Sequence, residues 1–336
     1  MLEKKRIPLG KQTVTLAGHE IPRTAALAPM ASVADHAYRL MCKKYGAAFV
    51  VGEMASAKGL CYSDKKTAEL LTCTAEEFPM AIQLFGSEPE FMAKACKIAE
   101  QYHPQWIDIN MGCPVHKVVS TGAGSALMRT PQLAADIVKA CADATSIPIT
   151  VKIRKGFDDT CINAPEMAVM LQEAGAQAIT VHGRTRKQMY TPPVDVDIIT
   201  QVKQAVSVPV IGNGDITTPQ LAEEMYQQTG CDLVMVGRGS YGHPWIFEEI
   251  SHYLETGELL PPKPLSQRLD IMMEHVELMC RLKGEKMAMR EARKHAAWYL
   301  KGVRGAAHFR NLCSSLETFA DMEHLAREVR AQNGIV

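Results

Sequence analysis

A cysteine just after a short apolar run is the first residue of this sequence that could do chemistry. Cys113 follows WIDINMG (106–112), precedes a proline and is followed by the glycine-containing segment GAGSALM (122–128). A free thiol with an ordinary pKa near ~8.5 is mostly protonated at neutral pH, so Cys113 can donate a proton as a general acid. The alternative reading is a buried structural cysteine beside a turn, because cysteine also serves as a small hydrophobe.

Polar or charged side chains lie at the ends of nearly all the short apolar runs in the first three quarters of the chain. These residues are Glu53, Gln83, Asn110, Lys152, Arg154, His182, Arg184, Asn213, Asp215 and Arg238. For any one of them, contact with solvent or an ion pair inside the fold is the simpler explanation. A full ring of such ends indicates a site if the strand ends meet in space.

Eight apolar runs carry these residues and are typical of strands in a parallel sheet that is buried on both faces. They lie at residues 25–30, 49–54, 80–86, 106–112, 148–154, 178–184, 209–215 and 233–239. Between them, residues 88–102, 130–144 and 164–175 have the apolar spacing of helices. Eight strand–helix units predict an α/β fold, a (β/α)8 TIM barrel with its site at the C-terminal ends of the strands. An open doubly wound sheet is the alternative, and the absence of GxGxxG after the first run argues against it.

The pattern changes in the last quarter of the chain. Residues 254–266 are rich in proline and predict a connector. From Gln267 onward the sequence has helical spacing without strand signals. We therefore predict a barrel domain over residues 1–250 and a smaller all-helical domain over residues 251–336.

Two glycine-containing segments after the last two runs predict a phosphate site. GNGD (212–215) and GRG (237–239) lie where barrels commonly bind phosphate through backbone N–H groups, and Arg238 adds a positive charge. Lys152 is placed to stabilise a negatively charged ring edge, and Gln83 to bond the polar edge of the same ring. A phosphate site beside a flat-ring site fits FMN better than a dinucleotide. A barrel without flavin, acting as an isomerase or aldolase through a Schiff base on Lys152, stays as an alternative.

Composition and charge narrow the class of protein. The chain has 336 residues, of which 47% are hydrophobic and 22% charged, and its net charge of zero does not by itself predict a polyanionic partner. The N-terminus lacks the apolar segment of an export signal, and no run reaches ~18 apolar residues, so we expect a cytoplasmic protein without a membrane segment. The ten cysteines include no CxxC pair, so we expect no metal site. We also expect a monomer.

Taken together, the motifs resemble those of the tRNA-dihydrouridine synthases, most closely the bacterial B-type branch. The matching segments, in chain order between residues 20 and 250, are APMASVADHAYR, QLFG, DINMGCP, GAGSALM, VKIR, VHGRTR, GNGDI and VGRG. The pairing of NMGCP with GAGSALM is specific to this family, whereas GNGD or GRG alone is not. The resemblance implies an FMN that is reduced by NADPH, with NADH as the alternative, and that then reduces a uridine in tRNA.

The resemblance also implies roles for individual residues. Contacts to FMN are implied for Pro29, Met30, Ala31, Gln83, Lys152, His182, Asn213, Gly214, Asp215, Gly237 and Arg238. Cys113 is then the proton donor, Asn110 faces the uracil, and Arg184 lies near the substrate. The sequence departs from the family after GRTRKQMY, where TPPVDVD replaces a glycine-containing motif. The role of the 190–197 loop is therefore open.

The chemistry that the resemblance implies follows from uracil, whose C5=C6 bond is conjugated to the C4 carbonyl. Hydride from flavin N5 should add to C6, and Cys113 should then protonate C5. The base must leave its stack in tRNA to reach a barrel site, at a cost of a few kcal/mol. The sequence does not determine which uridine is the target.

The charge distribution supports an RNA partner. Residues 281–310 hold nine lysines and arginines against two glutamates, a net charge of +7. Helical spacing brings Arg290, Arg293, Lys294 and Lys301 within a few turns, so we expect them to form a phosphate-binding face for tRNA. A solvated helical face is the alternative reading of such a charge run.

Two other functions stay open from the sequence. A flavin barrel that acts on a free pyrimidine, as dihydroorotate dehydrogenases do, would use the same cofactor but leaves the basic segment unexplained. A non-catalytic RNA-binding protein that keeps the barrel as a scaffold would explain that segment. The presence of Cys113 and Lys152 argues against the second alternative.

Overall fold

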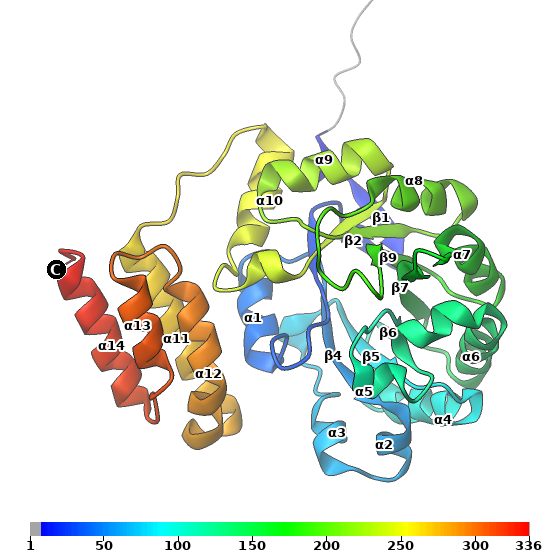
Figure 1. Cartoon of the computed structure of the whole chain (residues 1–336), viewed down its shortest axis with the longest axis horizontal. Coiled ribbons are helices and arrows are strands. Elements are labelled where there is room, and N and C mark those ends of the chain that lie inside the picture. The colour runs from blue at the N-terminus through cyan, green and yellow to red at the C-terminus, as the bar shows by residue number, and fades with distance from the viewer. Residues whose placement is uncertain (1–7, 336) are drawn as a thin grey trace, which may run out of the picture.

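Eight parallel strands close into a barrel at the centre of the larger part of the molecule (Figure 1). The computed structural model describes residues 8–335 of the chain. The barrel strands are β3 (Ala25–Leu27), β4 (Val50–Ser56), β5 (Met80–Phe85), β6 (Trp106–Met111), β7 (Ile149–Asp158), β9 (Ile179–Thr185), β10 (Val210–Asn213) and β11 (Leu233–Val236). Each of the eight predicted runs overlaps one of these strands, and β4, β7 and β9 extend beyond the ends of their runs. Because β6 pairs with β7 and β11 pairs with β3, the ring is closed and the open-sheet alternative is wrong.

Helices surround the barrel on its outer face (Figure 1). They are α1 (His36–Lys44), α2 (Ala57–Cys61), α3 (Lys65–Glu69), α4 (Pro89–Glu100), α5 (His116–Val119), α6 (Pro131–Ala144), α7 (Ala164–Glu173), α8 (Val196–Ala205), α9 (Pro219–Thr229) and α10 (Ile246–Thr256). Short 3-10 helices are η1 (Leu9–Lys11), η2 (Ala75–Glu77), η3 (Gly124–Arg129) and η4 (Arg238–Ser240). Helix α9 begins as its sequence indicates, since Pro219 is its first residue and the Thr218 hydroxyl accepts from the Leu221 N–H.

A hairpin that the sequence analysis did not predict packs on the end of the barrel where the strands begin. It consists of β1 (Thr13–Leu16) and β2 (His19–Pro22), which pair antiparallel. Leu16 and Ile21 are fully buried in a cluster with Phe49 and Trp106. The opposite end, where the strands finish, is left for a site. A short strand β8 (Cys161–Ile162) pairs antiparallel with the end of β7.

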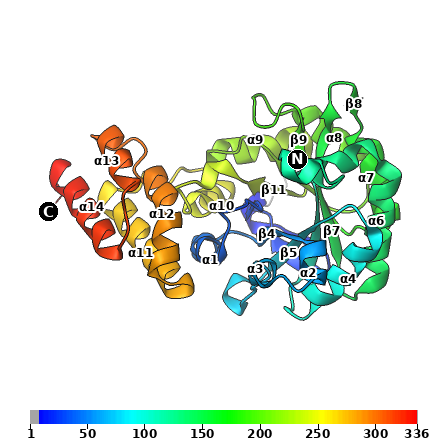
Figure 2. The ribbon, with the colours of Figure 1, turned by 60° about the horizontal axis from the view of Figure 1, so that its bottom comes forward.

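Four further helices form a separate bundle beside the barrel. These are α11 (Leu265–Lys283), α12 (Glu285–Tyr299), α13 (Ala306–Cys313) and α14 (Phe319–Gln332). Figures 1 and 2 both show this bundle on the side of the barrel that carries α1 and α10. Helix α10 contributes Phe247 and Ile250 to the barrel core, so the boundary predicted between residues 250 and 251 falls inside α10. The change of core takes place across the 257–264 segment.

The barrel and the bundle share a buried junction. Ala37 and Met41 of α1 belong to the apolar core of the bundle. The Lys283 ammonium of α11 lies 2.6 Å from an Asp35 carboxylate oxygen at the start of α1. Lys294 of α12 donates a hydrogen bond to the Ser32 carbonyl of the barrel. The bundle is therefore seated on the barrel by both apolar and polar contacts.

Two features of residues 8–335 concern membrane segments and metal sites. None of the helices in this range has the length and hydropathy that crossing a membrane requires. The same range has no group of three or more His, Cys, Asp or Glu side chains that could hold a metal ion. The predicted absence of an export signal concerns the N-terminus. Its first seven residues, 1–7, lie outside the described residues.

Candidate active site

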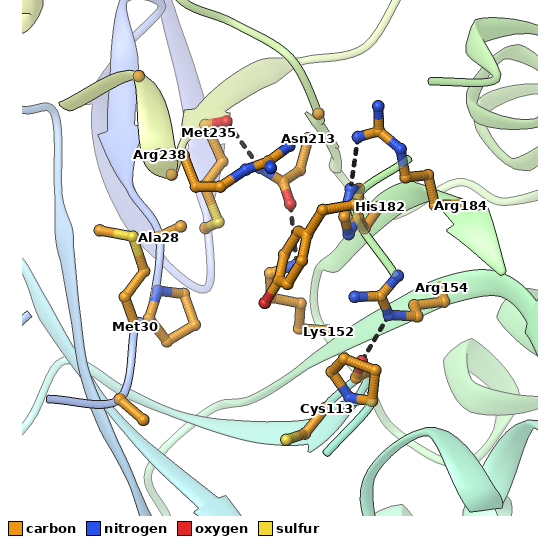
Figure 3. A pocket seen from close by; sticks show the side chains of 18 of the residues that line it. Ala28, Met30, Cys113, Lys152, Arg154, His182, Arg184, Asn213, Met235 and Arg238 are labelled. Atoms are coloured by element: carbon orange, nitrogen blue, oxygen red, sulfur yellow. Dashed lines mark hydrogen bonds between the residues drawn. The ribbon is translucent and has the colours of Figure 1, made fainter. Parts of the chain in front are cut away.

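A cavity of about 540 Å³ lies at the C-terminal ends of the barrel strands. Every barrel residue to which the sequence analysis gave a role lines it, whereas Glu53, also at a run end, does not and instead accepts a hydrogen bond from the Ser32 backbone N–H. The lining residues with such a role are Pro29, Met30, Ala31, Gln83, Asn110, Cys113, Lys152, His182, Arg184, Asn213, Gly214, Asp215, Gly237 and Arg238. Figure 3 shows Cys113 and Arg238 on opposite sides of this cavity, with Lys152 between them. Its volume is in the range of cofactor and small-molecule sites.

Of the four bundle cations predicted to bind tRNA phosphates, Lys301 lines this cavity, whereas Arg290, Arg293 and Lys294 lie outside it. Arg290 is exposed and lines a separate shallow hollow with Lys283 and Lys286. The Arg293 guanidinium donates to the Leu316 carbonyl at 2.9 Å, and Lys294 donates to the Ser32 carbonyl. The side chains of Arg293 and Lys294 are therefore each hydrogen-bonded to a backbone carbonyl of the protein itself. Their roles toward tRNA stay predictions.

A buried polar network lies beneath the cysteine. The Asp108 carboxylate accepts from the Thr150 hydroxyl at 2.7 Å and from the Gln83 amide at 2.7 Å. The Gln83 amide oxygen in turn accepts from the Asn110 amide at 2.9 Å. The Asn110 side-chain oxygen accepts the Cys113 backbone N–H at 2.9 Å. A chain of bonds from the barrel interior therefore holds the cysteine loop.

The GAGSALM segment holds the same loop from the other side. Ser125 donates to the Cys113 carbonyl with its backbone N–H at 3.1 Å and with its hydroxyl at 2.9 Å. Gly124 has φ +60°, and a Cβ there would lie 2.9 Å from the same carbonyl oxygen. Only glycine combines this backbone conformation with so close an approach. The DINMGCP and GAGSALM motifs therefore pack directly against each other in the structure.

The environment of the Cys113 thiol favours its protonated form. Burial raises its pKa, while the Val115 backbone N–H and the Arg154 charge act in the opposite direction. Burial is the largest of these effects, so the thiol carries its proton at neutral pH. A protonated thiol at the wall of a cavity is what proton donation to a bound substrate requires.

The environment of Lys152 lowers the pKa of its side chain and so favours its neutral form. Its ammonium donates to the Asn213 side-chain oxygen at 3.0 Å, and the Asn213 amide is fixed because it donates to the Met235 carbonyl at 2.9 Å. Burial and the neighbouring Arg154 charge lower the pKa of Lys152 to about 7, against the opposing effect of Asp108. A ligand acceptor or negative charge placed here would restore the charged form.

Arg184 and His182 line the cavity beside the two glycine-containing loops, 212–215 and 237–239, that were predicted to bind phosphate. Arg184 is fully buried, pairs with the Asp215 carboxylate and donates to the Thr191 carbonyl at 2.7 Å. Burial and the surrounding cations hold the pKa of His182 well below its usual range, so its imidazole is neutral. Arg184 therefore ties the 190–197 loop to the loop after β10. Its predicted place near the substrate stays a prediction.

Two cavity residues had no role assigned from the sequence. Arg154, which the sequence placed among the polar run ends without a role, donates to the Gly112 carbonyl at 2.7 Å and to the Met189 carbonyl at 2.9 Å, so it joins the cysteine loop to the loop after β9. The Arg238 guanidinium lies 4.6 Å from the centre of the Tyr190 ring, in the loop that departs from the family pattern. Nothing in the sequence indicated that Tyr190 faces the cavity.

The charges that line the cavity define what it can hold. Five cations line it, namely Lys152, Arg154, Arg184, Arg238 and Lys301, against the single carboxylate of Asp215. Glycine-containing loops follow β10 and β11. These features define a (β/α)8 barrel protein with a cation-lined cavity at the carboxyl ends of its strands, which suits an anionic ligand. The chain belongs to the dihydrouridine synthase family, whose family model matches residues 26–333.

Relatives with similar sequences carry consistent names. The chain is 42% identical over 297 residues to the tRNA-dihydrouridine synthase B of Pseudomonas aeruginosa, covering 88% of this chain and 90% of that protein. It is 40% identical over 303 residues to the tRNA-dihydrouridine synthase B of Vibrio cholerae, covering 90% of this chain and 94% of that protein. A probable tRNA-dihydrouridine synthase of Rickettsia conorii is 42% identical over 292 residues, or 87% of this chain and 88% of that protein.

Solved structures of lower identity share the barrel. A morphinone reductase variant in complex with tetrahydroNAD superposes with a TM-score of 0.52 at 11% identity, covering 77% of this chain and 93% of that chain. A histamine dehydrogenase from a Rhizobium species superposes with a TM-score of 0.56 at 12% identity, covering 80% of this chain and 51% of that chain. At these identities the likeness concerns the fold alone. It agrees with the predicted TIM barrel.

Proposed function

We propose that this protein reduces the C5=C6 bond of specific uridines in tRNA to give 5,6-dihydrouridine. One observation carries the proposal: in a chain of the dihydrouridine synthase family, Cys113 lies in the wall of a cation-lined barrel cavity, where burial raises the pKa of its thiol. This arrangement would place a proton donor and an anionic cofactor within one cavity. Reduction of a carbon–carbon double bond needs both a hydride and a proton.

The residues present fit a flavin mononucleotide. The polar ring edge would lie against Lys152 and Gln83, and Met30 would contact the ring as a soft apolar surface. The phosphate would lie against the loops of Gly214 and Arg238. Gly214 has φ +138°, and a Cβ there would lie 2.5 Å from a Val194 methyl carbon, so this loop requires glycine. The cavity of about 540 Å³ suits a mononucleotide better than a dinucleotide.

The protein residues divide the work of the reaction between them. When bound, the reduced flavin supplies a hydride to C6 of the uracil. The electron pair of the C5=C6 bond then moves toward C5 and the C4 carbonyl, and Cys113 transfers its thiol proton to C5. The Arg154 charge opposes the pKa-raising effect of burial at Cys113, so it stabilises the thiolate that remains. Solvent returns the proton before the next turnover.

The remaining partners are proposed from the same site. We propose NADPH as the reductant, with NADH as the alternative, reaching the cavity that the uridine later enters. We also propose a monomer. We propose a cytoplasmic location, because the tRNA substrate is modified and used there.

The first test is an anaerobic re-oxidation experiment. The purified protein is reduced, and the flavin absorbance is followed after addition of tRNA that lacks dihydrouridine, with orotate as a comparison. Re-oxidation by tRNA alone is the expected result. Re-oxidation by orotate alone would move the activity to a free pyrimidine. A protein that carries no flavin would remove the cofactor assignment and reopen the isomerase or aldolase alternative.

The proton donor is tested by Cys113→Ala. We expect re-oxidation by tRNA to slow by about 100-fold or more, since general acids typically contribute on this scale. Cys61→Ala is the matched control, because Cys61 is also half-buried but lies outside the cavity. Equal rates in the Cys113→Ala variant and the wild type would show that Cys113 is not the acid.

A further inference from the structure

One residue of the helical bundle reaches the cavity of the barrel. Within residues 8–335, Lys301 is the only residue from α11–α14 and their connections that lines it. Lys301 lies in the turn between α12 and α13 and is exposed. The other lining cations all come from the barrel. The rim of the cavity is therefore built partly by the second domain.

The turn that carries Lys301 is held firmly against the barrel. Arg268 of α11 donates to the Tyr299 carbonyl at 2.8 Å and to the Lys301 carbonyl at 3.0 Å, which caps the end of α12. The Trp298 ring stacks on the Tyr241 ring of the barrel with a centroid distance of 4.1 Å and an interplanar angle of 18°. Tyr241 itself lines the cavity. The backbone at Lys301 is thus placed relative to the cavity, while its side chain stays exposed.

The loop after Tyr241 confirms how close this contact is. Gly242 has φ +62°, and a Cβ there would lie 2.4 Å from the Trp298 carbonyl carbon. The barrel loop and the end of α12 therefore touch through their backbones. A contact of this kind leaves little freedom for the Lys301 turn to move away from the rim.

The charge of Lys301 has no protein partner among the described residues. In that part of the chain no carboxylate lies within ion-pair distance of its ammonium. The one carboxylate that lines the cavity, Asp215, pairs with Arg184 and lies 3.5 Å from Arg238. A flexible ammonium at a rim suits a single phosphate oxygen, since it acts as a compact point charge. The free charge at this edge is thus suited to an anion that enters from the side of the bundle.

We propose that Lys301 binds a backbone phosphate next to the target uridine and holds the extruded nucleotide in the cavity. This proposal rests on the proposed function, because it assumes that the ligand is tRNA. A base that enters the cavity must be extruded at a cost of a few kcal/mol, and its flanking phosphates must then pass the rim. Lys301 would offset part of that cost and would couple docking of tRNA on the bundle to the reaction in the barrel.

The test compares Lys301→Met with Lys301→Arg and with a matched control. Lys97→Met serves as the control, since Lys97 is an exposed lysine of α4 outside the cavity. We expect Lys301→Met to lower kcat/KM for tRNA by about 10-fold, as loss of a charged contact would. Lys301→Arg should recover most of this activity, and Lys97→Met should retain all of it. Flavin content and Tm verify that each variant is folded.

A binding measurement separates this proposal from the proposed function. For tRNA binding, the slope of log affinity against log salt should fall in magnitude by about 1 in Lys301→Met, since one phosphate contact is lost. An unchanged slope together with unchanged kcat/KM would overturn the role of Lys301. A wild type that binds tRNA but reduces none would overturn the proposed function, and the slope alone would then decide the contact. A Lys97→Met variant that loses as much as Lys301→Met would also overturn the proposal.

Discussion

At the scale of single residues, burial shifts the pKa values of two cavity residues, Cys113 and Lys152, in opposite directions. It raises the pKa of Cys113, which keeps a proton available, and it lowers the pKa of Lys152 to about 7. The same physical effect, the cost of burying a charge, thus gives one group that donates and one that responds to a ligand. The Arg154 charge lowers the pKa of both groups.

The state of Lys152 gives a pH-dependent prediction. Its pKa of about 7 in the free protein should rise when a flavin acceptor is bound, so binding takes up a proton. Flavin affinity should therefore be full below pH 7 and fall as the pH rises from about 7 to the pKa of the bound state. Titration of the flavin-free protein at several pH values measures this dependence.

The control for this prediction is the Lys152→Met variant. It should bind flavin more weakly at pH 7, and its affinity should not show the same decline above that pH. Lys139→Met, an exposed lysine that pairs with Asp143 on α6, should behave as the wild type. A decline of equal size in Lys152→Met would assign the titration to another group.

At the scale of elements, the cysteine loop depends on segments that precede and follow it in the chain. Asn110 on β6 holds it from below, and η3 holds it through Ser125. Arg154 on β7 holds the adjoining Gly112 carbonyl. Three elements therefore fix the loop that carries Cys113.

Gly124→Ala should displace this loop. A Cβ at residue 124 meets the Cys113 carbonyl at 2.9 Å, in addition to the cost of about 1–2 kcal/mol for a left-handed backbone. We expect slower re-oxidation by tRNA together with a lower Tm. The measurement is single-turnover re-oxidation, accompanied by thermal unfolding.

Gly46→Ala separates the two effects of that substitution. Gly46 also has a positive φ, of +86°, but a Cβ there meets nothing within 4 Å. The left-handed backbone should lower the stability of this variant about as much as that of Gly124→Ala. Its re-oxidation rate should equal that of the wild type. If Gly46→Ala slows the reaction as much as Gly124→Ala, general destabilisation and not loop displacement is the cause.

At the scale of the whole molecule, the bundle is joined to the barrel around two buried histidines. His275 and His295 stand with ring centroids 4.8 Å apart, and Tyr38 of α1 lies 5.3 Å from the first of them. Burial lowers the pKa of His275 to about 4, while Asp35 acts in the opposite direction and Lys283 adds to the lowering. Both imidazoles are therefore neutral in the folded protein at neutral pH.

This junction makes stability depend on pH in a defined window. Unfolding frees His275 to bind a proton near its ordinary pKa of 6.5, whereas the folded protein binds it only near 4. Stability is therefore full above pH 6.5 and falls as the pH drops from about 6.5 to about 4. The contribution of His275 is of order 3 kcal/mol. Asp35, whose pKa is lowered to about 2, loses its contribution only below this window.

Urea unfolding at pH 7.5 and pH 5 measures the effect. The loss of stability between the two values should be smaller in His275→Gln than in the wild type. His308→Gln, at an exposed position of α13, should leave the loss unchanged. An equal loss in His275→Gln and the wild type would show that the junction does not carry the pH dependence.

The sequence by itself determined the parts of this protein that depend on neighbouring residues. Continuous apolar runs predicted all eight barrel strands, because burial on both faces needs apolar side chains at every position. The polar residues at the run ends predicted the lining of the cavity, because parallel strands bring their carboxyl ends to one side. Cys113 and its glycine-containing partner segment were found in this way, and the family resemblance followed from them.

Only the tertiary structure decided which distant residues meet. The hairpin β1–β2 escaped prediction because short exposed strands lack a strong period, and it is fixed by burial of Leu16 and Ile21 on the barrel. Lys294 contacts Ser32 and Lys301 reaches the cavity because the bundle is seated on α1, a contact that no local spacing encodes. The periodicity of apolar residues can be recognised within a short segment of sequence. These contacts, in contrast, depend on how two separate cores pack together.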